Sequence, residues 1–240
     1  MRISFNTLRR AIVGAAAVTS VLAAPTLTAQ TIEQAGNGIP LYGVGVPSIA
    51  TFGQTFVSPL DGLLNSFSFW LSNEGNAPDA NTVDAQDLKF RAYVMAWDGG
   101  KAVGPALYTS DIVFGPTQVA QEFAFSPASL NVTAGTTYVA FLSAAGLFGD
   151  IVGFPSSALL LSDEDGSGGS LVFLDSGDDT SLFTNPTADQ AWMTGTEFGA
   201  PQAQFKAAFS TTVPEPGAAV LLVTGFGALG LVRIGRRRTA

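Results

Sequence analysis

The chemistry open to this chain is limited first by two residue types that it lacks. Among its 240 residues there is no histidine and no cysteine. A Ser-His or Cys-His pair for nucleophilic catalysis is therefore excluded, as are disulfides, haem and zinc in its usual ligand sets. Carboxylate chemistry, a Ser-Lys pair and oxygen-ligated metals remain. We predict a non-enzymatic protein with no cofactor other than a candidate calcium ion, and the alternative is a hydrolase that uses a carboxylate pair.

An acidic loop carries the candidate ligands for that calcium ion. Asp163, Asp165 and Ser167 supply oxygen atoms at positions 1, 3 and 5 of the loop, and glycine follows at position 6, as in the first half of a calcium-binding loop. The second half does not match, because Leu174 stands where a bidentate glutamate belongs. A hairpin loop with incidental acids is the alternative. A complete site would need a second acidic cluster to fold back, namely Asp175, Asp178 and Asp179.

Aromatic residues occupy alternate positions in two predicted strands. Successive side chains of a strand point to opposite faces, so each strand would place these rings on the face away from the core. The residues of this predicted platform are Trp70, Arg91, Tyr93 and Trp97. Flat rings beside hydrogen-bonding groups can stack against sugar rings, which indicates carbohydrate binding. The alternative is that loops cover this face and make the rings a second layer of core.

The same alternation assigns the core faces of the two strands. In the first strand, the core face is continuous if Asn65 sits at an edge. The residues expected to face the core are Leu63, Phe67, Phe69 and Leu71 in the first strand, and Phe90, Ala92, Val94 and Ala96 in the second.

Short apolar or alternating runs separated by Gly, Pro, Asn and Asp predict an all-β protein. The predicted strands are Ala50–Val57, Leu63–Leu71, Leu88–Trp97, Ala106–Phe114, Val119–Phe125, Thr137–Ser143, Ala158–Leu161, Ser170–Leu174 and Gln204–Ser210. Many short strands with frequent turn signals favour an antiparallel β-sandwich in a single domain. The stretches Gly53-Gln54-Thr55-Phe56 and Phe90-Arg91-Ala92-Tyr93 are similar to jelly-roll-like modules of exported bacterial proteins, so we expect a jelly-roll-like sandwich.

The charge of the central region limits its partners. Residues 30–212 carry 18 acidic and 4 basic side chains, a net charge of −14. With no basic stripe to meet phosphates, nucleic acid is excluded as a partner. Divalent cations, or simple solubility outside the cell, fit this charge better.

The N-terminus predicts a secretory signal peptide. Residues 1–10 hold three arginines and no acid, and 11–24 form a run of small and apolar residues. This order is typical of a signal peptide that is removed after export. We expect cleavage after Ala29, with cleavage after Ala23 as the alternative.

The C-terminus predicts a single membrane helix. The 16 residues Gly217–Val232 carry no charge, and as a helix they would span roughly 24 Å, short of the roughly 30 Å hydrocarbon core. The basic residues that follow predict a cytoplasmic end, so the preceding domain would lie outside the cell. These residues are Arg233, Arg236, Arg237 and Arg238.

These features together resemble the PEP-CTERM sorting signal of exported bacterial proteins. The motif residues are Val213, Pro214, Glu215 and Pro216, followed by the apolar run and the arginine-rich end. The resemblance covers about 28 residues. It implies recognition and cleavage by an exosortase, a membrane-embedded protease-transpeptidase, in a bacterium that makes exopolysaccharide and biofilm. An ordinary tail anchor, which would make the protein a membrane-anchored adhesin, is the alternative.

The sequence as a whole predicts three parts: a signal peptide (1–29), an extracellular β-sandwich (30–212) and a sorting signal (213–240). We expect an exported protein, membrane-associated before processing and then at the cell surface or in the extracellular matrix. Its expected partners are an exosortase-like protease and an exopolysaccharide.

Overall fold

The computed structural model describes residues 28–36, 38–45, 49–73, 85–148, 157–162, 169–195 and 202–211. Residues 27–212 form one compact unit. Residues 1–27 of the predicted signal peptide, the acidic loop with Asp163, Asp165 and Ser167, and the predicted sorting signal 213–240 lie outside the described residues. None of the helices within the described ranges is both long enough and apolar enough to cross a membrane.

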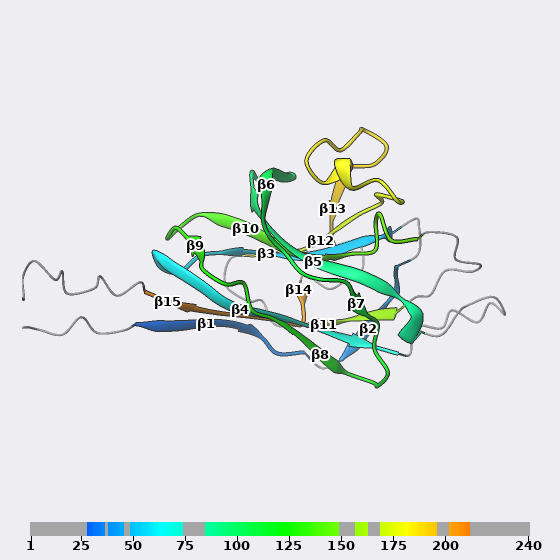
Figure 1. Ribbon diagram of the computed structural model, residues 1–240, viewed down its shortest axis with the longest axis horizontal. Helices are drawn as coiled ribbons and strands as arrows, with labels where there is room; N and C mark the ends of the chain where they lie inside the picture. Colours follow the sequence, from blue (N-terminus) through cyan, green and yellow to red (C-terminus); the bar gives the residue numbers. More distant parts are fainter. Residues whose placement is uncertain are drawn as a thin grey trace, which may run out of the picture. The chain divides into compact units, whose positions relative to one another are not determined.

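Within these ranges the protein is all-β, apart from the short 3₁₀ helices η3 (Ala85–Asp87) and η4 (Thr180–Phe183). The strands form two antiparallel sheets, which lie one above the other in Figure 1. Sheet A contains β1 (Ala29–Gln34), β2 (Ile39–Val44), β4 (Gly62–Ser72), β8 (Gln121–Phe125), β9 (Leu130–Val132), β11 (Ser157–Ser162), β14 (Gln202–Ala203) and β15 (Phe205–Ser210). Sheet B contains β3 (Thr51–Val57), β5 (Lys89–Trp97), β6 (Ala102–Thr109), β7 (Val113–Phe114), β10 (Thr137–Ser143), β12 (Leu171–Leu174) and β13 (Trp192–Thr194). The predicted all-β class with antiparallel sheets is confirmed.

The chain passes repeatedly from one sheet to the other. In sheet A, β2 pairs with β11, β11 with β4, and β4 with β8. In sheet B, β3 pairs with β10, β10 with β5, and β5 with β6. Strands that follow one another in sequence, such as β3 and β4 or β10 and β11, therefore lie in different sheets. Both sheets are built mainly from long-range pairings.

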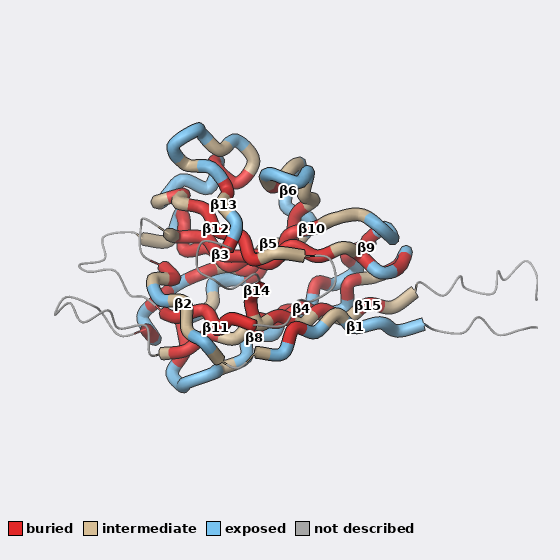
Figure 2. Tube along the Cα trace, turned by 180° about the vertical axis from the view of Figure 1, so that it is seen from behind, coloured by how far each residue is buried: buried red, intermediate tan, exposed pale blue. Residues whose placement is uncertain are grey.

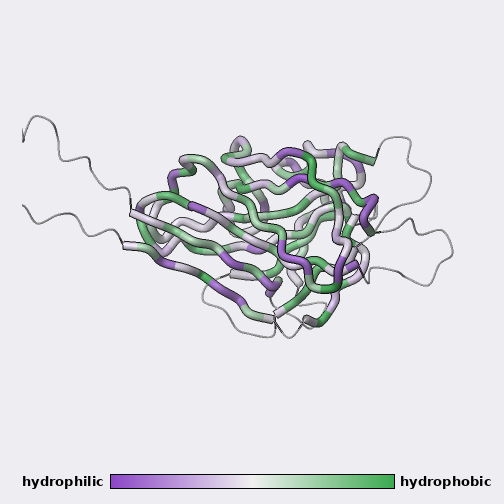
Figure 3. The backbone as a smooth tube through the Cα atoms, turned by 60° about the horizontal axis from the view of Figure 1, so that its bottom comes forward, coloured by the Kyte–Doolittle hydropathy of each residue, from purple (hydrophilic) through white to green (hydrophobic). Residues whose placement is uncertain are grey.

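Phenylalanine side chains fill the space between the sheets. Phe56 of sheet B packs against Phe205 and Phe209 of sheet A, with ring centroids 5.7 and 5.9 Å apart. Phe90 of sheet B meets Phe123 of sheet A at 5.4 Å. Each fully buried aromatic side chain contributes roughly 1.5–3 kcal/mol through the area it removes from water. Apolar residues follow the strands along much of the chain (Figure 3).

A buried group of glutamine side chains also joins the two sheets. Gln54 of β3 donates from Nε2 to Gln202 Oε1 of β14 at 2.6 Å, and its own Oε1 accepts from the Ala203 backbone N–H at 2.8 Å. Gln34, the last residue of β1, donates to the same Gln202 oxygen at 2.6 Å. Burying a polar group costs free energy unless it is hydrogen-bonded, and within this network Gln34 Oε1 is buried without a hydrogen-bond partner. This network therefore holds β1 and β14 in register with sheet B.

Because of a β-bulge in β4, one part of the predicted core face differs from the face that the structure buries. Ser66 pairs with Ala208 and Leu64 pairs with Phe209, so Asn65 is an extra residue in β4. An extra residue reverses the alternation of faces beyond it. Leu64 therefore points into the core with 0% exposure, and Leu63, which was predicted to do so, is only partly buried.

Candidate functional site

The four residues of the predicted aromatic platform do not share one surface. Trp70 lies in β4 of sheet A, between the buried core residues Phe69 and Leu71, and therefore faces away from the core. Arg91, Tyr93 and Trp97 lie in β5 of sheet B. Their face is opposite to that of the core residues Phe90, Ala92 and Val94. Because the outer faces of two packed sheets point in opposite directions, Trp70 does not share a face with the other three residues.

The outer face of sheet B is covered by the segment that contains η4 and β13. Tyr93 stacks on Phe141 with centroids 4.9 Å apart and meets the edge of Phe183 at 5.4 Å. Trp97 makes an edge-to-face contact with Trp192 at 5.4 Å. In Figure 1 this covering segment is the yellow stretch beside β12 and β13, and Figure 2 shows its buried and exposed residues from behind. Tyr93 and Trp97 thus pack within a second apolar cluster. This agrees with the alternative interpretation of the sequence, in which other segments cover these rings.

Burial within this second cluster affects the ionisation of Tyr93. Burial raises the pKa of its hydroxyl group, and the nearby charge of Arg91 acts in the opposite direction. The ring is only partly buried, but both of its aromatic contacts are with protein side chains. Tyr93 therefore has little free ring surface for a ligand.

Two of the aspartates that a complete calcium site would need, Asp178 and Asp179, accept backbone hydrogen bonds in and around the covering segment. Asp178 Oδ1 accepts hydrogen bonds from the backbone N–H groups of Gly146 at 2.6 Å and Phe148 at 3.4 Å. Asp179 caps η4 by accepting from the Ser181 N–H at 2.8 Å. Hydrogen bonding from the Ser181 side chain, and then from this N–H, lowers the pKa of Asp179. Across the described part of the chain, no group of three or more acidic side chains is arranged to hold a metal ion.

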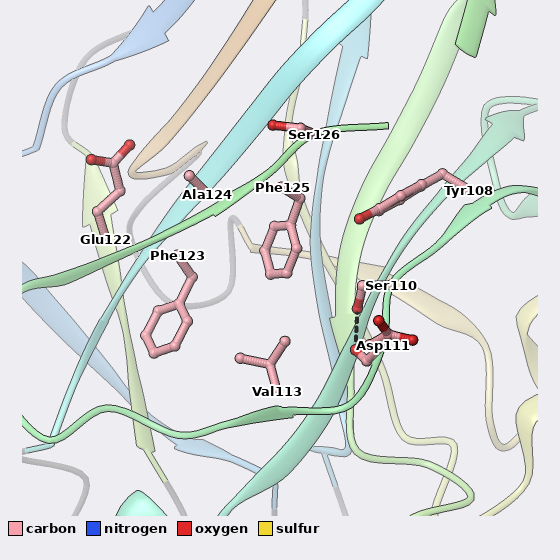
Figure 4. Close-up of a pocket in the computed structure, with 9 residues that line it drawn as sticks. All are labelled: Tyr108, Ser110, Asp111, Val113, Glu122, Phe123, Ala124, Phe125 and Ser126. Atoms are coloured by element: carbon pink, nitrogen blue, oxygen red, sulfur yellow. Dashed lines mark hydrogen bonds between the residues drawn. The ribbon is translucent and has the colours of Figure 1, made fainter. Parts of the chain in front are cut away.

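An open groove lies elsewhere on the molecule, where an edge of sheet B comes close to an edge of sheet A. It has a volume of about 530 Å³. It lies between β8 and the kinked edge formed by β6 and β7 (Figure 4). The lining residues are Tyr108, Ser110, Asp111, Val113, Glu122, Phe123, Ala124, Phe125 and Ser126.

Ser110 lines the groove and lies between the end of β6 and the start of β7. Its backbone N–H donates to Ala92 O, and its side-chain Oγ accepts from the Ala92 N–H, both at 2.9 Å. The same hydroxyl donates to Asp111 O at 2.6 Å, and Arg91 Nη1 donates to Ser110 O at 2.7 Å. The serine hydroxyl thus takes the place of a backbone acceptor opposite the Ala92 N–H of β5, and β6 ends at Thr109. The predicted strand Ala106–Phe114 is accordingly divided between β6 and β7.

Aromatic side chains form the floor of the groove. In β8, Phe123 and Phe125 point inward and alternate with the exposed Glu122 and Ala124. Phe125 stacks on Phe67 of β4 with centroids 5.2 Å apart. Tyr108 meets the same Phe67 edge-on at 5.7 Å and is only partly buried. Of the three lining rings, Tyr108 therefore offers the most surface to a ligand.

The groove is acidic. Asp111 and Glu122 are exposed carboxylates, and none of its lining residues is basic. The pKa of Tyr108 is raised, first by burial and then by the negative charge of Asp111. The groove therefore combines an apolar floor with carboxylate oxygen atoms that accept hydrogen bonds.

The local sequence pattern does not reveal this groove. The only signal it offered was the polar pair Ser110 and Asp111 inside an apolar run. The opposite wall comes from β8, and β8 reaches the groove because it pairs with β4 in the other sheet. That proximity depends on tertiary pairing, so local pattern could not reveal it.

No protein-family model and no curated protein matches the chain. Among solved structures, it is similar to the cysteine protease and lectin-like domains of Cwp84, a surface layer associated protein of Clostridium difficile. That similarity has a TM-score of 0.44 and 12% sequence identity, and it covers 77% of this chain and 36% of that chain. A similarity of this size supports no conclusion about fold or function.

Proposed function

We propose that this is an exported, non-enzymatic protein of the cell surface or extracellular matrix, and that it binds carbohydrate in the groove between β7 and β8. The observation that carries the proposal is an open groove in which the partly buried ring of Tyr108 lies beside the exposed carboxylate of Asp111. The apolar faces of sugar rings pack on aromatic side chains, and sugar hydroxyl groups donate hydrogen bonds to carboxylates. The open form of the groove suits a polymer that passes through it.

The order of the strands supports a jelly-roll topology for the domain. The line β2-β11-β4-β8 in one sheet and the line β3-β10-β5-β6 in the other are connected as expected for paired Greek keys. Lectin domains occur among proteins with this architecture. Because one fold serves many functions, the proposal rests on the groove and not on the topology.

The two ends of the described domain lie side by side. β1 pairs with β15, and the Thr211 N–H donates to Thr28 O at 3.0 Å. Both predicted processing segments therefore connect to the domain at the same place. Cleavage after Ala23 would keep β1 whole, whereas cleavage after Ala29 would remove its first residue, which pairs with Ser210.

The proposed sorting step predicts the fate of a motif variant. Replacing Pro214, Glu215 and Pro216 by alanines should leave an uncleaved species in the membrane, because the exosortase would no longer recognise its substrate. Intact-mass measurement of the protein from its native host, with its cell fraction noted, tests this. Normal processing of the variant would contradict the sorting proposal, and a full-length wild-type tail in the membrane would identify a plain anchor.

Carbohydrate binding is tested at Tyr108. Tyr108→Ala should weaken binding of an oligosaccharide about twofold to thirteenfold, as expected for a lost stacking contact of roughly 0.5–1.5 kcal/mol. Tyr108→Phe keeps the ring and should retain most of the affinity. Isothermal titration gives the affinities, and a thermal melt of each variant separates lost binding from lost folding. Unchanged affinity in a folded Tyr108→Ala protein would rule out the groove as the binding site.

The alternative function is a carboxylate-based hydrolase. It is favoured by one observation, namely that Asp111 and Glu122 line the same groove, as the acid and base of a glycosidase must. Release of reducing ends from a polysaccharide by the wild-type protein, abolished in both Asp111→Asn and Glu122→Gln, would replace the binding proposal with the enzymatic one.

A further inference from the structure

We infer that the outer face of sheet B is a contact surface through which two copies of this chain pair about a two-fold axis. One end of that face is apolar and basic, and the segment that covers the other end is acidic. A two-fold axis would bring the apolar, basic end of each copy against the acidic segment of the other. This surface lies outside the groove, and the inference does not depend on carbohydrate binding.

The covering segment leaves the first part of β5 open. Lys89 and Arg91 share the outer face of this strand with Tyr93 and Trp97, because all four alternate with core residues. The rings of η4 and β13 contact Tyr93 and Trp97. Lys89, in contrast, is exposed, and Arg91 is only partly buried. The outer face of sheet B is therefore uncovered where β5 begins.

Exposed apolar side chains lie at this uncovered end. Phe114 of β7 pairs with Lys89, so the two side chains lie on the same face of the sheet. Phe114 is 59% exposed, and Ile112, two residues earlier, is 42% exposed. Val113, between them, lines the groove, so it points to the other side of β7. We call Lys89, Arg91, Ile112 and Phe114 the open patch.

The open patch holds two of the four basic side chains of residues 30–212, a region with a net charge of −14. The one ion pair among the described residues joins Lys206 to Glu33, so no acidic partner neutralises the two cations of the patch. Asp87, two residues before Lys89, is the nearest acid along β5. Two copies of so acidic a domain repel each other over most of their surfaces. Contact between copies is therefore favoured where these cations meet acidic side chains.

The covering segment supplies those acidic side chains. Residues 175–195 contain four aspartates and no basic residue, and Asp178, Asp179 and Asp189 are exposed. The segment lies over the same sheet face as the open patch, from Tyr93 onward. A two-fold contact uses the same surface of both copies, so each open patch would meet the covering segment of the other copy. The ring of Phe114 would be the aromatic anchor of each contact.

The test measures the oligomeric state of the protein secreted by its host, by sedimentation velocity at increasing concentration. We expect a reversible change from monomer to dimer. Phe114→Ala removes two anchors from one dimer and should raise the dissociation constant about thirtyfold or more. Lys89→Glu removes two exposed ion pairs and should raise it about twofold to thirtyfold.

Matched controls change the same residue types elsewhere. Ile39→Ala alters an apolar residue of β2 in sheet A that is 50% exposed, and Lys101→Glu reverses a charge at the β5–β6 turn. Both should leave the dissociation constant nearly unchanged. A thermal melt of each variant at low concentration, where the protein is a monomer, shows that it is folded.

A mixture of two charge variants tests the two-fold arrangement itself. Lys89→Glu and Asp189→Lys should each pair poorly alone, because like charges would then meet at both contacts. Mixed in equal amounts, they should pair about as tightly as the wild type, since each contact again joins opposite charges.

Several results would overturn the inference. A monomer at every concentration would do so, as would assemblies that grow beyond a dimer, because a two-fold contact closes on itself. Dimers that tolerate both Phe114→Ala and Lys89→Glu would place the contact on another surface. Equal weakening by Lys101→Glu and Lys89→Glu would attribute the effect to overall charge. A mixture that pairs no better than its components would rule out the pairing of patch with covering segment.

Discussion

Two aromatic regions of this protein look alike in sequence and differ in the structure. Tyr93 and Trp97 alternate with core residues along β5, and Phe123 and Phe125 alternate with exposed residues along β8. The first region lies under η4 and β13, which come from a segment about 80 residues further along the chain. The second lines an open groove, beside which Ser110 interrupts the strand. Whether an aromatic face is covered therefore depends on what the rest of the chain places over it.

The largest expected effect is a loss of stability, and it tests whether the covered region is part of the core. Phe141 has 0% exposure and contacts Tyr93, Phe183 and Trp192. Phe141→Ala should lower the free energy of unfolding by about 3–5 kcal/mol, because it leaves a cavity. Denaturant unfolding measures this value.

The control for that substitution is Phe114→Ala, at a ring that is 59% exposed. It should change stability little, since few of its contacts would be lost. If Phe141→Ala were equally mild, the outer face of sheet B would not be a second core layer. The comparison between the covered and open regions would then fail.

An intermediate effect is expected at the kink beside the groove. Ser110→Ala removes the acceptor of the buried Ala92 N–H and should cost about 1–3 kcal/mol. It should also weaken carbohydrate binding, because β6 and β7 would no longer be held apart in the same way. Ser126→Ala is the control, because Ser126 also lines the groove but is exposed and makes no comparable buried hydrogen bond. A Ser110→Ala protein with wild-type stability and affinity would show that the kink does not depend on this side chain.

The smallest effect concerns alkaline pH. Burial raises the pKa of Tyr93, so the folded protein keeps this proton to a higher pH than the unfolded chain. The stability it contributes is fully present below the unfolded pKa of about 10 and is lost as pH rises through the folded pKa. Tyr93→Phe should therefore lose less stability than wild type between about pH 9 and pH 11. Thermal melts of wild type and Tyr93→Phe across this range measure the difference.

The strands that were predicted correctly are those that carry a strong local pattern. Thr137–Ser143 matches β10, and Leu88–Trp97 matches β5 within one residue. Their apolar residues alternate or run together because both strands are central in sheet B. β1 was not predicted, since most of its side chains are exposed and an exposed edge strand needs no apolar alternation. Asn65 was noticed in sequence, but its role as a bulge depends on pairing with β15.

The amino-acid sequence by itself determined the all-β class, most of the core residues, the acidic charge and the absence of histidine and cysteine chemistry. These properties depend on composition and on a two-residue period, and both are local. The tertiary structure alone decided that Trp70 lies on a different sheet from Tyr93, that a distant segment covers Tyr93 and Trp97, and that Tyr108 and Phe125 share a groove. Each of these depends on which strands pair across long stretches of chain, because burial is a property of the whole assembled sandwich.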